Sequence, residues 1–246
     1  MSKHRLDQYL VDLGLFPSRA RARDAILRGT VSVNGATCTK PAQKVGSDST
    51  IKVEDPASRY VSRAALKLIE GLDRFAIDPA NLICLDIGAS TGGFTQVLLE
   101  RGAAKVHAID VGHDQLHDLL RGDARVVARE GLNARDLSLA DLDGDRPDLL
   151  VSDVSFISLK LALPPALDLA APGACGVFLV KPQFEAGKEN IGKGGLVDPD
   201  LAAETARSIQ TWLGTVDGWS AADLVPSPVK GGDGNAEWLL LGHKAL

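Results

Sequence analysis

The chain has 246 residues, of which 45% are hydrophobic and 24% are charged. These proportions are ordinary for a soluble globular protein and exclude a largely disordered chain. The N-terminal stretch MSKHRLDQYL lacks the apolar core of a signal peptide, and prolines and an aspartate interrupt the apolar stretch 161–180, so we expect a cytoplasmic protein. Cys38, Cys84 and Cys175 are far apart, which predicts buried structural thiols, and neither they nor the histidines have a spacing that predicts a metal site.

Positive and negative charges are unevenly distributed along the chain. Residues 1–75 contain 13 Lys and Arg against 8 Asp and Glu, a net charge of +5, whereas the remaining residues carry −10. A basic N-terminal part on an acidic body indicates that a polyanion would be bound at the N-terminal part. Solvated surfaces of opposite sign are the alternative, and the charge distribution alone does not decide between the two.

The N-terminal residues predict two helices followed by a small sheet. Apolar residues recur at helical spacing in two segments between Arg5 and Leu27, with Ser18 as the N-cap of the second. Alternating valines and the pair Asn34-Gly35 then predict a hairpin. A cationic helix face suits contacts with phosphates, although solubility alone would also explain it. The candidate phosphate ligands here are Arg5, Arg19, Arg21, Arg23 and Arg28.

Beyond a short connection at 55–61, strands and helices alternate to the end of the chain. This alternation predicts an α/β domain over 62–246 with a mostly parallel sheet, after an N-terminal domain over 1–54. The predicted strands are 82–87, 105–110, 125–128, 147–152, 175–181, 219–225 and 236–242. The segment PSPVKGGDGN between the last two strands is too short for a crossover helix, so we expect the seventh strand to be antiparallel to its neighbours.

A glycine-rich turn follows the first of these strands, in the run LDIGASTGGFT at 85–95. Such a turn, followed by a helix, lets the backbone approach a nucleotide-type ligand, although a generic tight turn also uses glycines. Asp110 ends the next strand, about 20 residues on, where a carboxylate can accept hydrogen bonds from ribose hydroxyls. The loop residues that we expect to bind a ligand are Gly88, Ser90, Thr91, Gly92, Gly93 and Phe94.

Three charged residues converge on the same edge of the predicted sheet. Asp153 and Lys181 follow the fourth and fifth strands, and Glu237 begins the antiparallel seventh strand. Ligands of open α/β sheets bind outside the carboxyl ends of the parallel strands, so we expect these three charged groups to lie near the Gly88 turn at a ligand-binding edge. Each residue alone would equally suit a surface ion pair or a helix cap.

The motifs SRAALKL, LDIGASTGGFT, DVSFISL, VKPQFE and GNAEWLL together resemble the TlyA branch of the FtsJ-like RNA methyltransferases. The helix pair and hairpin, through RLDQYL, SRARARDAILRG and VSVNG, resemble the S-four RNA-binding domain. The resemblance implies a Rossmann-like seven-stranded methyltransferase sheet and S-adenosylmethionine as cofactor. It also implies methyl transfer to a ribose 2′-hydroxyl of ribosomal RNA, with cytidine as target.

The resemblance also implies roles for individual residues. Lys181 would be the base and Asp153 would lie near the cofactor and the nucleophile, while Lys67 and Glu237 would orient the base and the substrate. Asn133 would contact adenine. Independently of the resemblance, segment 186–195 has too many glycines for a helix, so we expect a mobile loop whose Lys188 and Lys193 touch RNA phosphates; Arg63 is a further candidate RNA ligand.

Three other functions compete with this interpretation. A non-catalytic RNA-binding assembly factor would tolerate loss of charged residues from the site. This chain retains all four, Lys67, Asp153, Lys181 and Glu237. A membrane-active haemolysin, a label that this family has carried, lacks a supporting amphipathic or transmembrane segment in the sequence. A dehydrogenase is disfavoured because Ser90 replaces the middle glycine of the dinucleotide pattern G-x-G-x-x-G.

Overall fold

The computed structural model describes residues 3–246, which divide into two compact units between Arg59 and Tyr60. The boundary between the units lies inside the expected connection 55–61. Asp55 and Ala57 from that connection accept hydrogen bonds from arginines of the first unit. Each unit has its own hydrophobic core.

The first unit contains the expected helix pair and hairpin. Its elements are β1 (Lys3–Arg5), α1 (Leu6–Asp12), α2 (Arg19–Leu27), β2 (Val31–Val33), β3 (Ala36–Thr37), β4 (Lys44–Gly46), β5 (Ile51–Val53) and the short helix η1 (Pro56–Arg59). The Ser18 side chain caps α2 by accepting from the Arg21 amide, as predicted. Asn34 and Gly35 both have positive φ angles, which the tight turn between β2 and β3 requires.

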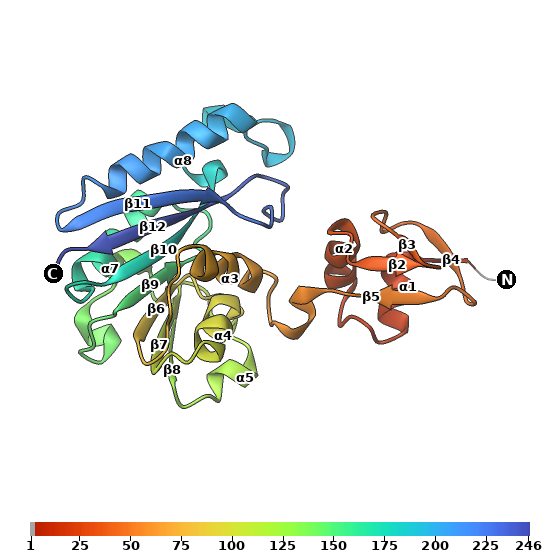
Figure 1. Ribbon diagram of the computed structural model, residues 1–246, viewed down its shortest axis with the longest axis horizontal. Coiled ribbons are helices and arrows are strands. Elements are labelled where there is room, and N and C mark those ends of the chain that lie inside the picture. The colour runs from red at the N-terminus through yellow and green to blue at the C-terminus, as the bar shows by residue number, and fades with distance from the viewer. Residues whose placement is uncertain (1–2) are drawn as a thin grey trace. The chain divides into compact units, whose positions relative to one another are not determined.

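The second unit contains one seven-stranded sheet in the order β11-β12-β10-β9-β6-β7-β8 (Figure 1). Its strands are β6 (Ile83–Ile87), β7 (Lys105–Asp110), β8 (Val126–Glu130), β9 (Leu149–Ser152), β10 (Cys175–Val180), β11 (Trp219–Pro226) and β12 (Trp238–Lys244). β12 pairs antiparallel with both β10 and β11, while the pairs from β10 to β8 are parallel. The predicted mixed sheet with an antiparallel seventh strand is therefore confirmed.

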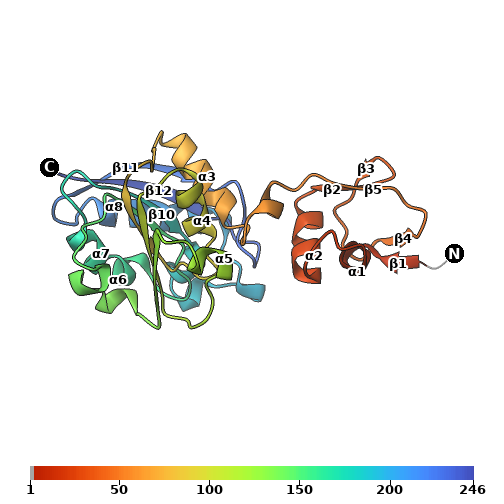
Figure 2. The same ribbon diagram turned by 90° about the horizontal axis from the view of Figure 1, so that it is seen from below.

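Helices cover both faces of this sheet (Figure 2). One face packs against α3 (Ala65–Arg74), α4 (Gly93–Glu100) and α5 (Asp118–Arg121). The other packs against α6 (Leu159–Ala162), α7 (Pro164–Leu169) and α8 (Pro199–Leu213). Short 3-10 helices connect several of these elements: η2 (Ala134–Asp136), η3 (Leu139–Leu142), η4 (Pro182–Phe184), η5 (Lys188–Asn190) and η6 (Lys193–Gly195).

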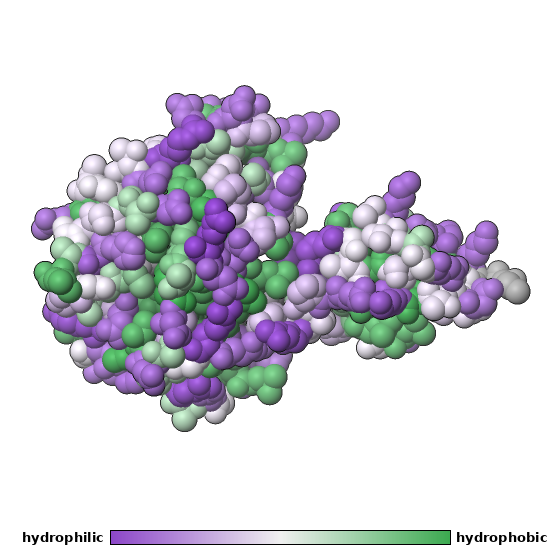
Figure 3. Space-filling view, in the orientation of Figure 1, coloured by the Kyte–Doolittle hydropathy of each residue, from purple (hydrophilic) through white to green (hydrophobic). Residues whose placement is uncertain are grey.

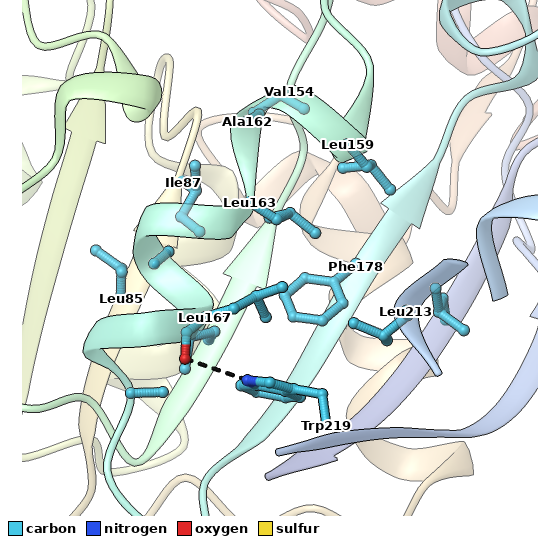
Figure 4. Packing of buried hydrophobic residues seen from close by; sticks show 14 of the residues in the cluster. Leu85, Ile87, Val154, Leu159, Ala162, Leu163, Leu167, Phe178, Leu213 and Trp219 are labelled. Atoms are coloured by element: carbon cyan, nitrogen blue, oxygen red, sulfur yellow. Dashed lines mark hydrogen bonds between the residues drawn. The ribbon is translucent and has the colours of Figure 1, made fainter. Parts of the chain in front are cut away.

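Aromatic and branched side chains fill the space between the sheet and α6 to α8 (Figure 4). The Phe178 and Trp219 rings lie 6.2 Å apart, and the Trp219 indole donates a 3.1 Å hydrogen bond to the Leu167 carbonyl. On the visible surface of the second unit, hydrophilic residues predominate and hydrophobic ones form separate patches (Figure 3). The close packing between the sheet and α6 to α8 supports the strands whose carboxyl ends carry the predicted site.

The three cysteines carry free thiols, and Cys38 and Cys84 are buried as expected. Burial raises the pKa of the Cys84 thiol well above its usual value. Cys175 is only partly buried. All three are reduced residues within or beside hydrophobic packing.

Candidate active site

The turn between β6 and α4 has a backbone that only small residues fit. Gly88 has a φ angle of +80°, and a Cβ there would lie 3.0–3.2 Å from Val154 atoms. Gly92, the N-cap of α4, has a φ angle of +95°. Ser90 also has a positive φ angle of 48°. The turn therefore brings backbone close to the segment after β9, where Asp153 lies.

A cavity of about 140 Å³ opens beside this turn. Its walls come from the turn, from the segment before α3, and from the ends of β6, β9 and β10. The lining residues are Ser62, Ala64, Asp86, Gly88, Ala89, Ser90, Thr91, Gly93, Phe94, Asp153, Ser155 and Lys181. Five of the predicted loop residues thus line one cavity with two of the four charged residues.

Asp86, near the end of β6, is a wall residue that the sequence prediction missed. Its carboxylate is fully buried and accepts a 2.7 Å hydrogen bond from Thr95 Oγ1. Its other oxygen, Oδ1, has no hydrogen-bond partner among residues 3–246. Burial raises the pKa of Asp86 to about 7. The only sequence signal for it is an acidic residue within an otherwise apolar strand, two positions before Gly88.

A second, larger cavity of about 1140 Å³ shares Gly88, Ser90, Asp153 and Ser155 with the first. Asp110 lies in its wall, and its two carboxylate oxygens accept from the amides of Ser90 and Gly112 at 2.8 and 2.7 Å. These bonds fix the carboxylate and leave each oxygen a further lone pair.

Asn133 also lines the larger cavity, while its side-chain oxygen accepts from the Arg135 amide and caps η2. Gln115, which the sequence prediction missed, lies in the same wall and accepts a 3.1 Å hydrogen bond from Ser90 Oγ. The residues expected to bind a nucleoside are thus brought together around one opening.

The four charged residues form two ion pairs rather than a single cluster. Lys67 Nζ, on α3, lies 2.6 Å from Glu237 Oε2, just before β12, and both side chains are at least 93% buried. Lys181 Nζ lies 2.7 Å from Asp153 Oδ1. This second contact is an ion pair without hydrogen-bond alignment, because Lys181 directs its N–H groups to Ser155 Oγ at 2.8 Å and the Asp153 carbonyl at 3.2 Å.

The two pairs influence each other electrostatically. Burial raises the pKa of Glu237, while the charges of Lys67 and Lys181 oppose this rise. Lys181 and Asp153 line the small cavity, whereas neither Lys67 nor Glu237 contributes to the walls of these two cavities. The Lys181–Asp153 pair is therefore accessible to a ligand there, and the Lys67–Glu237 pair is a buried neighbour.

The segment after Asp153 carries an unusually exposed aromatic side chain. Phe156 is 90% exposed and has a positive φ angle of 65°, which a non-glycine residue seldom adopts. Its ring lies 5.1 Å from that of Phe184 on η4, and both rings line the larger cavity. Gln183 lines it too, so the VKPQFE motif contributes directly to this opening.

The arginines of the first unit are organised by buried carboxylates. Asp7, buried on α1, accepts from the guanidinium groups of Arg5 and Arg19 at 2.9–3.0 Å. These hydrogen bonds hold the pKa of the Asp7 carboxyl far below its usual range. Together with Arg23, these arginines line a hollow of about 440 Å³.

The remaining predicted RNA ligands lie in different settings. Arg28 pairs with both Asp24 and Asp55 and its side chain is only 17% exposed, which is the setting of a structural residue. Arg21 donates to the Ala57 carbonyl. Arg63 is half-buried just before α3, whereas Lys188 and Lys193 are exposed, with Lys188 on the rim of the larger cavity.

Within residues 3–246, no helix is both long enough and apolar enough to cross a membrane.

Comparison with known proteins links both units to described families. The family model of the FtsJ-like methyltransferases matches residues 60–244, and that of the S4 domain matches residues 4–51. The chain is 45% identical over 238 residues to the 16S/23S rRNA (cytidine-2'-O)-methyltransferase TlyA of Mycobacterium tuberculosis, covering 96% of this chain and 88% of that protein. It is 42% identical over 235 residues to Hemolysin A of Brachyspira hyodysenteriae, covering 96% and 98%.

A solved structure agrees with these matches. A Streptococcus thermophilus protein named as a candidate hemolysin aligns with a TM-score of 0.77 and 39% identity, covering 100% of this chain and 90% of that one. The domain matches and the identity over nearly the whole length together show that the chain belongs to the TlyA branch of the FtsJ-like methyltransferases.

Proposed function

We propose that this protein transfers a methyl group from S-adenosylmethionine to the ribose 2′-hydroxyl of a cytidine in ribosomal RNA. The observation that carries the proposal is the placement of the Lys181–Asp153 pair in the wall of the cavity beside the glycine-rich turn. The family relation and the names of the relatives supply the reaction and the substrate. The same reasoning predicts that the protein works in the cytoplasm, where ribosomal RNA is found.

The residues around the two cavities suit S-adenosylmethionine. Gly88 lets the turn lie close to the segment that carries Asp153, Asp110 has free lone pairs for ribose hydroxyls, and the unpartnered Oδ1 of Asp86 suits an ammonium group. The N-terminus of α4 presents backbone amides to a carboxylate. When bound, the cofactor supplies a methyl group on a positively charged sulfur, which leaves as a neutral thioether.

We assign the removal of the hydroxyl proton to Lys181. The neutral amine carries two hydrogens on Nζ. It can donate one to Ser155 Oγ and the other to the Asp153 carbonyl. Its lone pair is then free to accept the proton of the 2′-hydroxyl. The carboxylate of Asp153, 2.7 Å away, stabilises the ammonium ion that results.

Lys67 and Glu237 hold this arrangement from the buried side. Their pair is net neutral, so it adds no strong field of one sign at Lys181, yet it ties α3 to the beginning of β12. A shift of either element would move the Glu237 charge, which acts on Lys181 and Asp153. We therefore assign these two residues to positioning rather than to proton transfer.

Two further surfaces suit RNA. Arg5, Arg19 and Arg23 surround a hollow whose guanidinium groups can contact phosphates. Phe156 and Phe184 present aromatic rings at the larger cavity, where an unpaired base can stack. Lys188 lies on the same rim, where a phosphate of that nucleotide would be neutralised.

The test is methyl incorporation from labelled S-adenosylmethionine into purified small and large ribosomal subunits, followed by mapping of the modified nucleotide. We expect 2′-O-methylcytidine with the wild type and a loss of roughly 10²–10⁴-fold in rate with Lys181→Ala. Lys105→Ala is the matched control, because Lys105 also pairs with a carboxylate, Asp145, but lies at the opposite end of the parallel strands. Its rate should stay within about twofold of wild type, since surface ion pairs contribute little.

Other outcomes separate the competing functions. Cofactor binding without incorporation into subunits or naked ribosomal RNA would favour an RNA-binding assembly factor. Release of dye from liposomes by the purified wild type, retained in Lys181→Ala, would favour the haemolysin that some relatives' names describe.

A further inference from the structure

The segment from Asp153 to Ser158 is anchored at both ends by charged side chains of the VKPQFE motif. At its beginning, Lys181 donates to the Asp153 carbonyl and to Ser155 Oγ. At its end, Glu185 accepts from Ser158 Oγ at 2.5 Å and from the Leu159 amide at 2.8 Å. Lys181 and Glu185, four positions apart in the chain, thus anchor the two ends of this segment. We refer to residues 153–158 as the bridge.

Phe156 lies at the middle of this bridge in the left-handed region of backbone space. A phenylalanine has no intrinsic preference for that conformation, which persists only where surrounding contacts enforce it. The Phe156 ring is almost fully exposed, so ring packing alone supplies little restraint. The hydrogen bonds of Lys181 and Glu185 are the polar contacts at the two ends that restrain it.

Glu185 contacts the N-terminus of α6 through the Leu159 amide, but it is not the N-cap residue of that helix. Ser158 already caps α6, which has four residues, by accepting from the Lys160 amide at 3.1 Å. Glu185 is part-buried, and burial raises the pKa of its carboxyl. Partial burial of a carboxyl group is unfavourable unless hydrogen bonds compensate for the lost contact with water. For Glu185, the hydrogen bonds from Ser158 and Leu159 provide this compensation.

We propose that Glu185 is a positioning residue for methyl transfer, which fixes the far end of the 153–158 bridge so that Phe156 is held against the target nucleotide. Glu185 is absent from the walls of both cavities, and it acts through Ser158 and Leu159 rather than by touching substrate. The inference rests on the proposed function, because Phe156 has a nucleotide to hold only if the protein binds RNA.

The test compares the full-length wild type with Glu185→Ala, Glu185→Gln, Phe156→Ala and the double variant Glu185→Ala/Phe156→Ala. Single-turnover methylation of ribosomal subunits is measured beside cofactor affinity and thermal stability. Glu189→Ala is the matched control, because this exposed carboxylate lies four residues farther along the same segment. Activity of the wild type is established first, so failure of the proposed function is recognised before the variants are compared.

We expect Glu185→Ala to lower the single-turnover rate by roughly tenfold to a hundredfold, because small misplacements of a substrate group have effects of that size. Affinity for S-adenosylmethionine should change less than about twofold, since Glu185 lines neither cavity. Glu185→Gln should retain most activity, because its amide can accept from the Leu159 amide and donate to Ser158 Oγ. In the Phe156→Ala background, Glu185→Ala should lower the rate by less than about threefold.

Three results would overturn the inference. One is an active wild type whose rate is unchanged by Glu185→Ala. Another is a Glu185→Ala effect that is as large without Phe156 as with it, since Glu185 would then not act through that ring. The third is a loss of activity that follows thermal stability in every variant, including Glu185→Gln. If Glu185→Ala does not fold, the variant Ser158→Ala takes its place in the same comparison. Ser158→Ala removes one of the two hydrogen bonds of Glu185, together with the cap of α6.

Discussion

The two units of this protein use buried carboxylates in opposite ways. In the S4 domain, Asp7 is buried while its partners Arg5 and Arg19 have side chains 45% and 54% exposed. In the methyltransferase domain, both members of each pair are largely withdrawn from water, down to 7% and 2% exposure for Lys67 and Glu237. The first arrangement directs positive charge outward, which suits docking on a polyanion, and the second fixes charge inside a site, which suits chemistry.

The largest effect should come from breaking the buried pair of the methyltransferase domain. Glu237→Ala leaves the Lys67 ammonium group buried without its partner, which should lower the free energy of unfolding by about 3–5 kcal/mol. Urea unfolding of the second unit measures this loss. The double variant Lys67→Met/Glu237→Leu should recover most of the stability but not the methylation, because the pair no longer positions α3 against β12. Recovery of both would show that the pair is only structural.

The next effect concerns the pH dependence of the same domain. The pKa of Asp86 is raised by burial to about 7, above its value in the unfolded chain, so the folded state binds the proton more tightly. The contribution of Asp86 to the free energy of unfolding is therefore fully present below about pH 4 and is lost as pH rises towards 7. Over this range the free energy of unfolding falls by up to about 1.4 kcal/mol per pH unit. Hydrogen exchange of β6 and β9 amides between pH 5 and 8 should show this slope in the wild type and not in Asp86→Asn.

Asp7 in the S4 domain should give the opposite sign. Because its pKa is lowered by Arg5 and Arg19, the folded state favours the ionised form, and the stabilisation is present above about pH 4. It is lost as pH falls below that value. Exchange of α1 amides should therefore accelerate on acidification in the wild type, and Asp7→Asn should be less stable by roughly 2 kcal/mol at pH 7, with a flatter acid profile. Equal profiles for the two proteins would contradict this assignment.

The smallest effect should separate exposed arginines from the structural one. Arg19→Ala should weaken binding to ribosomal subunits and reduce the slope of log affinity against log salt by roughly one, as loss of one phosphate contact does. Arg28→Ala should instead lower the stability of the S4 domain, because Arg28 joins Asp24 and Asp55, and should leave the salt slope unchanged. A reduced slope for Arg28→Ala would place it among the phosphate ligands.

Much of this organisation was predictable from sequence because it follows from topology. The strand ends that place Asp153 and Lys181 together, and the short connection that makes β12 antiparallel and brings Glu237 to the same edge, follow from strand order and loop length. These are properties of the backbone path, which hydrophobic patterns and turn residues report directly.

The finer arrangement depends on side-chain geometry that no sequence pattern encodes. That Lys67 selects Glu237 while Lys181 selects Asp153 depends on rotamers and on the depth of each residue in the fold. The same holds for Arg28. The sequence predicts a phosphate ligand on a cationic helix, but in the structure two carboxylates pair with its side chain. The segment around Phe156, whose φ angle is positive, is hydrogen-bonded by residues more than 20 positions away, so the local sequence carries no signal for these restraints.

The pairing of Lys67 with Glu237 also bears on how the protein reaches its active form. These residues are 170 positions apart, and contacts of such long range tend to form late because much of the chain must already be ordered. In the folded chain, β12 lies between β10 and β11, and this position brings Glu237 to the Lys67 ammonium group. Formation of the buried pair thus requires this edge of the sheet to be assembled, so we expect it to be among the last contacts of the second unit to form as the chain folds.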